Sequence, residues 1–228
     1  MKGVFITGTD TGVGKTFVAR AVIQAWRRAG LNVGVMKPCE TGCEKRGKQM
    51  FPSDAFLLSD AAGGSQDLGE VCPFRFAAPM APAEAAAVEG GVFLMKRALE
   101  TFESIRDRHD SVVVEGAGGL LVPYTESQTT ADLAAAMGLP LVIVARIGLG
   151  TINHTGLTVQ AARRRGLDIA GVVFNRCADP ADQPPGPSED RNPDAVARMY
   201  DVKVLGSIPF LPDDNPTSAL PFLDLDPL

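Results

Sequence analysis

Short runs of apolar residues alternate along the chain with longer amphipathic stretches. The apolar runs predict strands, and the stretches between them predict helices, because their apolar positions recur with helical spacing. Runs such as Val112-Val113-Val114 are apolar at every position, which is typical of strands buried on both faces of a parallel sheet. We expect strands at residues 4–7, 32–36, 111–115, 140–145, 169–174 and 202–205, and helices at residues 16–29, 92–108, 130–137, 152–165 and 193–200.

This alternation predicts an α/β fold with a doubly wound, mainly parallel sheet and helices on both faces. Ligands of such sheets bind at the carboxyl ends of the strands. The 228 residues suit one large domain, residues 1–228, without an internal boundary. Residues 178–193 are polar and rich in proline and are expected to form a mobile loop, and residues 212–228 are expected to form a loop-like C-terminal tail.

The first predicted strand runs into a glycine-rich turn, residues 8–16, of sequence GTDTGVGKT. Backbone N–H groups of such a turn and the N-terminus of the following helix point at phosphate oxygens. Lys15 is expected to reach the β- and γ-phosphates, and the Thr16 hydroxyl to bind Mg²⁺. The turn is a long variant, because Thr9 stands where the usual pattern has glycine and Gly8 lies one residue earlier. The sequence therefore predicts a nucleoside triphosphate site on a sheet of the P-loop NTPase type.

Charged residues follow other predicted strands at the same edge of the sheet. Lys37 follows the second strand, and a second lysine near a triphosphate suggests an anionic co-substrate or transition-state stabilisation. Asp54 opens a helical stretch, where it either caps the helix or binds Mg²⁺. Glu115 closes a buried strand, where a carboxylate is costly unless it binds metal or pairs with a cation. We favour the metal for Glu115, with Asp10 as a weaker candidate ligand.

The fifth predicted strand ends at Asn175 and Arg176. An asparagine amide carries a donor and an acceptor side by side, which suits the edge of adenine, although asparagine is also a common turn residue. The residues after the last strand, Pro209, Phe210 and Leu211, are expected to form a wall beside the base.

Composition narrows the classes of partner. Hydrophobic residues make up 45% of the chain and charged residues 21%, as in ordinary globular proteins. The net charge is −5 and no basic run exceeds Arg163-Arg164-Arg165, so nucleic acid is not an expected partner. No apolar stretch reaches the length of a membrane span, which predicts a cytoplasmic protein without a membrane partner. Four cysteines without a Cys-x-x-Cys pair, and two histidines, make a zinc site unexpected.

The ordered set of motifs resembles the dethiobiotin synthetase family. The matching segments are GTDTGVGKT, KPCETG, SDA, VEGAGG, GTINH, Asn175 and IPFL, in family order between residues 6 and 211. The resemblance implies an ATP-dependent ligase of biotin biosynthesis that closes a cyclic urea from 7,8-diaminononanoate and CO₂ (or bicarbonate). In that reaction one amine captures CO₂ as a carbamate, the carbamate takes the γ-phosphoryl group of ATP, and the second amine closes the ring with release of ADP and phosphate.

The resemblance also implies roles for individual residues. The catalytic residues would be Lys37, which would hold the carbamate, and Lys15, which would hold the phosphates. Thr11, Thr41, Gly118 and Asn153 would contact the substrate, with Asn153 acting across a homodimer interface or simply capping its helix. Thr16, Asp54 and Glu115 would position Mg²⁺. The ATP-binding set would be Gly12, Val13, Gly14, Lys15, Thr16, Phe17, Asp54, Glu115, Gly116, Ala117, Gly118, Asn175, Arg176, Pro209, Phe210 and Leu211. Many relatives carry an acid where this chain has Gly12, so the role of that position stays open.

Three other classes of protein share some of these features. A partitioning ATPase of the same fold carries a lysine early in the loop, where this chain has Asp10. A cobyrinate-type amidotransferase adds a glutaminase domain, for which 228 residues leave no room. A nucleotide-binding protein without catalysis has no need of both Lys37 and Glu115.

Overall fold

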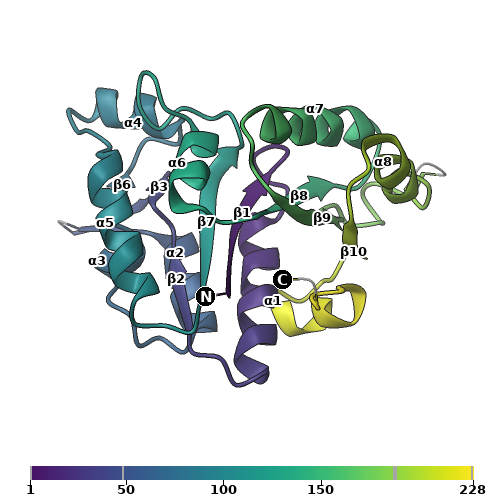
Figure 1. Ribbon diagram of the computed structural model, residues 1–228, viewed down its shortest axis with the longest axis horizontal. Helices are drawn as coiled ribbons and strands as arrows, with labels where there is room; N and C mark the ends of the chain where they lie inside the picture. The colour runs from purple at the N-terminus through teal and green to yellow at the C-terminus, as the bar shows by residue number, and fades with distance from the viewer. Residues whose placement is uncertain (1, 48, 187–188, 227) are drawn as a thin grey trace.

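Six parallel strands form the central sheet of the computed structural model, which describes residues 2–47, 49–186, 189–226 and 228. The strand order is β10-β9-β8-β1-β7-β2 (Figure 1). Because β1 lies between β7 and β8, the glycine-rich turn that follows it stands at the centre of the carboxyl edge. The strands are β1 (Lys2–Gly8), β2 (Val33–Met36), β7 (Ser111–Gly119), β8 (Leu141–Arg146), β9 (Ile169–Asn175) and β10 (Val204–Ile208).

Both faces of the sheet are covered, and each carries its own core. In β7, Val113 faces one core while Val112 and Val114 face the other, so every position of the apolar run is used. The predicted α/β fold class is thereby confirmed. One face is covered by α1 (Lys15–Arg28), α2 (Ser53–Ala61), α3 (Leu68–Val71) and the 3₁₀ helix η1 (Pro216–Phe222), and the other by α4 (Pro82–Val88), α5 (Met95–Arg106), α6 (Thr130–Met137), α7 (Thr151–Arg164) and α8 (Asn192–Tyr200).

Two small two-stranded sheets lie between β2 and α4 in the sequence. In the parallel pair, β3 (Cys39–Thr41) runs beside β6 (Phe74–Phe76). In the antiparallel pair, β4 (Glu44–Arg46) runs beside β5 (Gln49–Phe51). The sequence did not predict these strands, because three residues are too few to show a period. The first pair matters for the site, since β3 carries the residues that follow Lys37.

The C-terminal segment differs from the expected loop-like tail. It contains η1, which packs against α1 and buries Pro216 and Ala219. Figure 1 shows this segment, in yellow, beside the purple helix α1. Arg20 of α1 adds an ion pair of 2.8 Å to Asp214. Its proline and polar residues interrupt any helical periodicity in the sequence, so the segment was not predicted as a helix. Its apolar side chains nevertheless complete the core on the α1 face.

Two further findings bear on the predicted class of protein. Within the described residues, no helix combines the length and apolar character needed to cross a bilayer. All four cysteines are free thiols, and Cys39, Cys43 and Cys72 are buried. The mobility predicted for residues 178–193 and the single-domain organisation stay predictions.

Candidate active site

A cavity of about 610 Å³ opens at the carboxyl ends of β1, β2 and β7. Residues from six separate stretches of the sequence line it, as expected for the edge of a doubly wound sheet. The predicted site residues that line it are Thr11, Gly12, Gly14, Lys15, Thr16, Lys37, Thr41, Asp54, Glu115, Ala117 and Gly118.

The glycine-rich turn leads directly into α1. Gly14 is the N-cap of this helix with a left-handed φ of 90°, and its carbonyl accepts the first helical bond, from the Val18 N–H. Lys15 folds back over the turn and donates to the Asp10 carbonyl at 3.0 Å. Burial lowers the pKa of the Lys15 ammonium, because its environment is poorly hydrated. This arrangement suits a turn that wraps around phosphate.

We expect Gly14→Ala to weaken ATP binding far more than Gly12→Ala. Both glycines have positive φ, so each alanine costs about 1–2 kcal/mol of backbone strain. A Cβ at Gly14 would stand 2.1 Å from the Asn175 amide nitrogen, whereas a Cβ at Gly12 would meet nothing within 4 Å. Calorimetric ATP titration of both variants, with thermal unfolding as the control for folding, measures the difference. Equal loss of affinity in the two variants would contradict this interpretation of the loop.

Lys37 lies between two carboxylates inside the cavity. Its ammonium donates to Asp54 Oδ2 at 2.9 Å and to Glu115 Oε1 at 2.5 Å. The Thr16 hydroxyl donates to the same Glu115 oxygen at 3.0 Å. Lys37 is 3% exposed and Glu115 is 0% exposed, so this is a buried ion-pair network.

Burial and the neighbouring charges shift the pKa values of Lys37, Asp54 and Glu115 in opposite directions. Burial alone lowers the pKa of Lys37, but Glu115 and Asp54 outweigh it and hold that pKa well above its usual range. Burial also opposes ionisation of Asp54, yet Lys37 holds the pKa of Asp54 below its usual value. Burial raises the pKa of Glu115, which contacts Lys37. Lys37 is therefore a fixed cation at the edge of the phosphate site.

The network decides one of the alternatives left open by the sequence. The N-cap of α2 is Pro52, and Asp54 is the second residue of the helix, so the capping role for Asp54 is wrong. Its carboxylate turns to Lys37 instead. The salt bridge considered for Glu115 is present, while its predicted role toward a metal stays a prediction.

The residues of this network fit Mg²⁺. Glu115 Oε2 is buried without a hydrogen-bond partner, which leaves acceptor capacity beside Thr16 and Asp54. Across the described ranges, no group of three or more His, Cys, Asp or Glu side chains is arranged to hold a metal by itself. Mg²⁺ does not need one, because it commonly takes one or two carboxylates and completes its shell with water and substrate phosphates.

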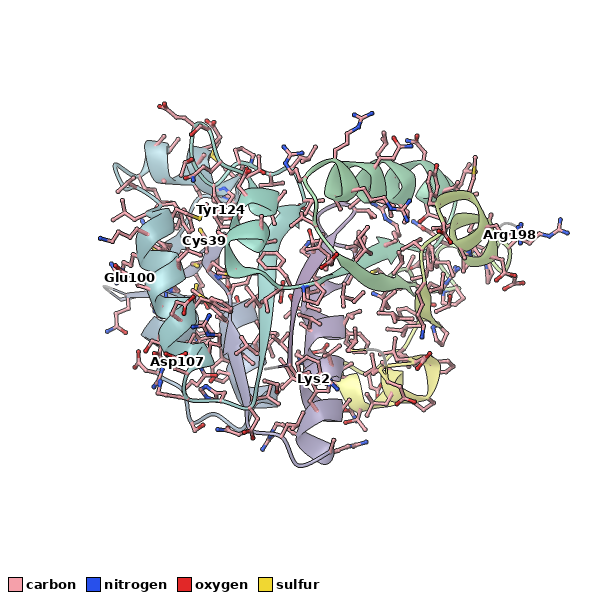
Figure 2. The ribbon with its side chains drawn as sticks, in the orientation of Figure 1. Lys2, Cys39, Glu100, Asp107, Tyr124 and Arg198 are labelled. Carbon is pink, nitrogen blue, oxygen red and sulfur yellow. The ribbon has the colours of Figure 1, made fainter. Side chains whose placement is uncertain are left out.

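Two buried residues that support the site were missed by the sequence argument. Glu40 is 5% exposed, and its carboxylate accepts the backbone N–H groups of Asp54 and Ala55. The Tyr124 hydroxyl accepts the Ala117 N–H at 2.9 Å and so fixes the glycine-rich end of β7. Figure 2 shows Tyr124 inside the molecule, whereas Arg198 projects outward from α8. A carboxylate inside the segment KPCETG was the one available signal for Glu40.

Several predicted ATP-binding residues lie outside this cavity. Asn175 donates to the Val13 carbonyl at 3.1 Å and to Cys177 Sγ, so its amide braces the glycine-rich turn. Arg176 pairs with Glu189. Gly116 faces Phe5 and Thr130, where a Cβ would collide. Val13 belongs to the core of the α1 face. Contacts of these residues, and of Phe17, Pro209, Phe210 and Leu211, with ATP stay predictions.

Asn153 also lies away from the cavity. It is the third residue of α7, whose N-cap is Gly150 with a φ of 90°, so the capping alternative for Asn153 is wrong. Its side chain is exposed, and its predicted contact with substrate across a dimer interface stays a prediction.

Comparison with known proteins gives consistent matches over nearly the whole chain. A family model described as an AAA domain matches residues 2–218. A protein of Anaeromyxobacter dehalogenans named ATP-dependent dethiobiotin synthetase BioD is 52% identical, with 93% of this chain and 92% of the relative covered. Proteins of the same name from Bacillus licheniformis and Bacillus subtilis are 43% and 39% identical, over 95% and 92% of this chain and 89% and 88% of their own lengths.

Solved structures match the fold at much lower identity. MinD cell division protein of Aquifex aeolicus superposes with a TM-score of 0.57 at 14% identity, covering 96% of this chain and 87% of that chain. MinD of Pyrococcus horikoshii gives a TM-score of 0.54 at 16% identity, covering 99% of this chain and 88% of that chain. These matches confirm a P-loop NTPase fold. Taken with relatives up to 52% identical over 93% of the sequence, they leave one assignment: the chain belongs to the dethiobiotin synthetase family.

Proposed function

We propose that this protein closes the ureido ring of dethiobiotin from 7,8-diaminononanoate, CO₂ and ATP, as an ATP-dependent ligase of biotin biosynthesis. The observation that carries the proposal is that a phosphate-binding turn and a second buried cation share one cavity. Lys15 of the glycine-rich turn and Lys37, which follows β2, both line this cavity. A phosphate site alone requires only the first lysine, whereas joining an anionic intermediate to the γ-phosphate requires a second.

The proposed reaction has three steps. One amine of the substrate adds to CO₂ and loses a proton, which gives a carbamate anion. A carbamate oxygen attacks the γ-phosphorus while the bond to ADP breaks, which gives a carbamic-phosphoric anhydride. The second amine attacks the carbonyl carbon, phosphate leaves with the former carbamate oxygen, and the amine proton passes to water or to phosphate.

The protein supplies position and charge for these steps. Lys37 would bind the carbamate and stabilise the charge that develops on the transferred phosphoryl group, and Lys15 would hold the phosphates. Thr11, Thr41 and Gly118, which line the same cavity, would orient the carbamate and the diamine. No protein nucleophile takes part.

Mg²⁺ would be held by Thr16, Asp54 and Glu115 and would neutralise charge on the phosphates of bound ATP. Lys37 contacts both of these carboxylates in the structure. We therefore expect its ammonium to turn toward the cavity when the metal is bound, where the carbamate would meet it.

We also propose that the protein is a homodimer. A shallow second cavity, lined by His154, Leu121 and Leu157 among others, adjoins the turn at Thr11. Leu121 is 51% exposed and Leu157 is 60% exposed, so this side of the molecule presents apolar surface beside α7. A dimer would bring Asn153 of one protomer toward the substrate of its partner. Light scattering coupled to size exclusion is expected to give twice the mass of 24.0 kDa, and a monomer at micromolar concentration would contradict the proposal.

The experiment that tests the proposed function is a substrate-omission assay. Purified protein with diaminononanoate, bicarbonate, Mg²⁺ and ATP is expected to form dethiobiotin and phosphate in equal amounts, with neither product when the diamine or Mg²⁺ is omitted. Phosphate release that does not depend on the diamine would favour a simple ATPase, and no release at all would reject the proposal.

A further inference from the structure

We infer that Glu40 is a positioning residue for the catalytic cluster: it fixes Asp54 and thereby sets Lys37 and the Mg²⁺ site. The inference rests on the proposed function, because it concerns how the Mg²⁺-ATP site is built. Glu40 has no role in the sequence motifs or in the family resemblance described above. The structure assigns it one through contacts to a neighbouring element.

The contacts of Glu40 lie at the start of α2. Its two carboxylate oxygens accept the N–H groups of Asp54 and Ala55, each at 3.0 Å. These N–H groups belong to the first turn of the helix, which has no partners of its own for them. The N-cap residue, Pro52, supplies no side-chain bond. Glu40, which lies on β3, therefore supplies the hydrogen-bond acceptors that the N-cap residue of α2 does not provide.

As a result, both the backbone and the side chain of Asp54 are fixed by hydrogen bonds. Its backbone N–H is bonded to Glu40, and its carboxylate accepts the Lys37 ammonium at 2.9 Å. Glu40 follows Lys37 by three residues, through Pro38 and the start of β3. The chain and the hydrogen bonds thus form a closed ring from Lys37 through Glu40 to Asp54 and back to Lys37. Removing the hydrogen bonds of Glu40 would release the first turn of α2, which carries Asp54.

Glu40 also sits on a well-anchored strand. β3 pairs with β6, with Glu40 opposite Arg75 in the register, and Cys39 beside it is fully buried. The next residue, Thr41, lines the cavity. One buried carboxylate therefore links the proposed diamine contact at Thr41 with the proposed metal ligand at Asp54.

The charge of Glu40 is needed for this geometry. A carboxylate accepts at both oxygens and is strengthened by the partial positive charge of a helix N-terminus. A glutamine in its place offers one oxygen and turns an NH₂ group toward the second backbone N–H, where donor meets donor. Glu40→Gln keeps the shape of the side chain and removes one of the two bonds.

The test compares Glu40→Gln with Asp67→Asn. Asp67 also caps a helix start, α3, with a carboxylate: its Oδ1 accepts the Gly69 and Glu70 N–H groups at 2.8 and 3.2 Å, and it lies outside the cavity. The measurements are thermal unfolding and the calorimetric affinity for ADP with and without Mg²⁺. Glu40→Gln is expected to lose some stability, whereas Asp67→Asn keeps one oxygen for both of its bonds and is expected to lose less. Glu40→Gln alone is expected to lose about 10-fold or more of the Mg²⁺-dependent gain in ADP affinity, the effect typical of lost outer-shell support.

A Mg²⁺-dependent gain in Glu40→Gln equal to that of the wild type would overturn the inference and leave Glu40 as a plain helix cap. If Glu40→Gln does not fold, Glu40→Asp, which keeps the charge one methylene group shorter, takes its place under the same criterion. If neither variant folds, Glu40 is a determinant of folding and the positioning role is rejected. A wild-type protein that binds ADP without any effect of Mg²⁺ would instead reject the metal site of the proposed function.

Discussion

Lys37→Met is expected to lower kcat for dethiobiotin formation by about 10³-fold, the scale of removing a fixed cation from a phosphoryl-transfer site. The substitution removes the ammonium that would bind the carbamate but leaves Lys15 and the glycine-rich turn intact. ATP affinity is therefore expected to change little. Steady-state kinetics and calorimetric ATP titration on the same preparation separate the two effects.

The control for this variant is Lys96→Met, a lysine of α5 with a side chain that is 89% exposed. It is expected to behave as the wild type in both measurements. Loss of ATP affinity in Lys37→Met as large as the loss of kcat would place Lys37 in the nucleotide site and remove the basis for its role toward the carbamate.

Stability of the same variant should depend on pH in a defined direction. Without Lys37, Glu115 is a buried carboxyl whose pKa burial raises. An acid whose pKa is higher in the folded than in the unfolded state destabilises the fold as the pH rises above the unfolded-state pKa, and the effect is complete above the folded-state pKa. Relative to the wild type, the free energy of unfolding of Lys37→Met is expected to fall by about 3–5 kcal/mol near neutral pH, the cost of an unpaired buried charge. This loss should shrink as the pH falls toward the pKa of a glutamate in the unfolded chain, about 4.3, which urea unfolding at several pH values measures.

Glu115→Gln is the second change with a large expected effect. It keeps the shape of the side chain but removes the charge that would bind Mg²⁺ and that now holds Lys37. We expect kcat to fall by about 10²-fold or more, because a metal contributes several kcal/mol to stabilising the transferred group. The Mg²⁺ concentration for half-maximal rate should rise as well. Phosphate release measured against Mg²⁺ concentration, with the exposed Glu100→Gln as control, tests both expectations.

The double variant Lys37→Met/Glu115→Gln distinguishes stability from catalysis. Removing both partners leaves no uncompensated charge at the pair, so the double variant is expected to be more stable than Lys37→Met alone. Its activity should stay at or below that of the less active single variant. If the stability effects were simply additive, the two residues would not be energetically coupled, in conflict with the 2.5 Å contact.

The sequence was most informative about the central sheet. The apolar runs of strands such as β7 and β8 reflect the helices that cover both faces of the sheet. Such runs can be recognised in the sequence without knowing which helices pack against them. Thr130–Met137 was predicted to the residue, and in the structure a capping box of Thr129 and Asp132 marks its start and Gly138 its end.

Elements stabilised by distant contacts were not predictable in the same way. The strand β3 is three residues long, and η1 contains a proline, so neither carries a periodic signal. Both are defined by what they pack against: β6 for the first and α1 for the second. Tertiary partners that lie far away in the sequence decide such segments.

The site shows the same division. Lys15, Lys37, Asp54 and Glu115 were singled out because each follows a strand or opens a helix at one edge, and Thr41 because of the family resemblance. The cavity brings all five together. Glu40 and Tyr124 act through backbone N–H groups of other segments, which no spacing in the sequence reveals. Asn175 illustrates a third case, because its amide was expected to recognise the edge of adenine, whereas in the structure its NH₂ group donates to the Val13 carbonyl of the glycine-rich turn.

Fold alone does not separate this protein from the MinD proteins that share it. The difference lies in single residues. Asp10 stands where partitioning ATPases of this fold carry a lysine, and its carboxylate faces Arg146 at 3.7 Å. Lys37, Asp54 and Glu115 form an ion-pair network that also contacts Thr16, the last residue of the turn. These side chains, more than the sheet, support a ligase over a switch.

The most direct test of a carbamate-phosphorylating enzyme follows one oxygen atom. Bicarbonate and CO₂ labelled with ¹⁸O are supplied with diaminononanoate, Mg²⁺ and unlabelled ATP, and the phosphate formed in a single turnover is measured by mass spectrometry. Attack of the carbamate on the γ-phosphorus predicts one ¹⁸O atom in each phosphate, because the anhydride breaks at its carbon–oxygen bond. Phosphate without label, formed together with dethiobiotin, would contradict the proposed anhydride.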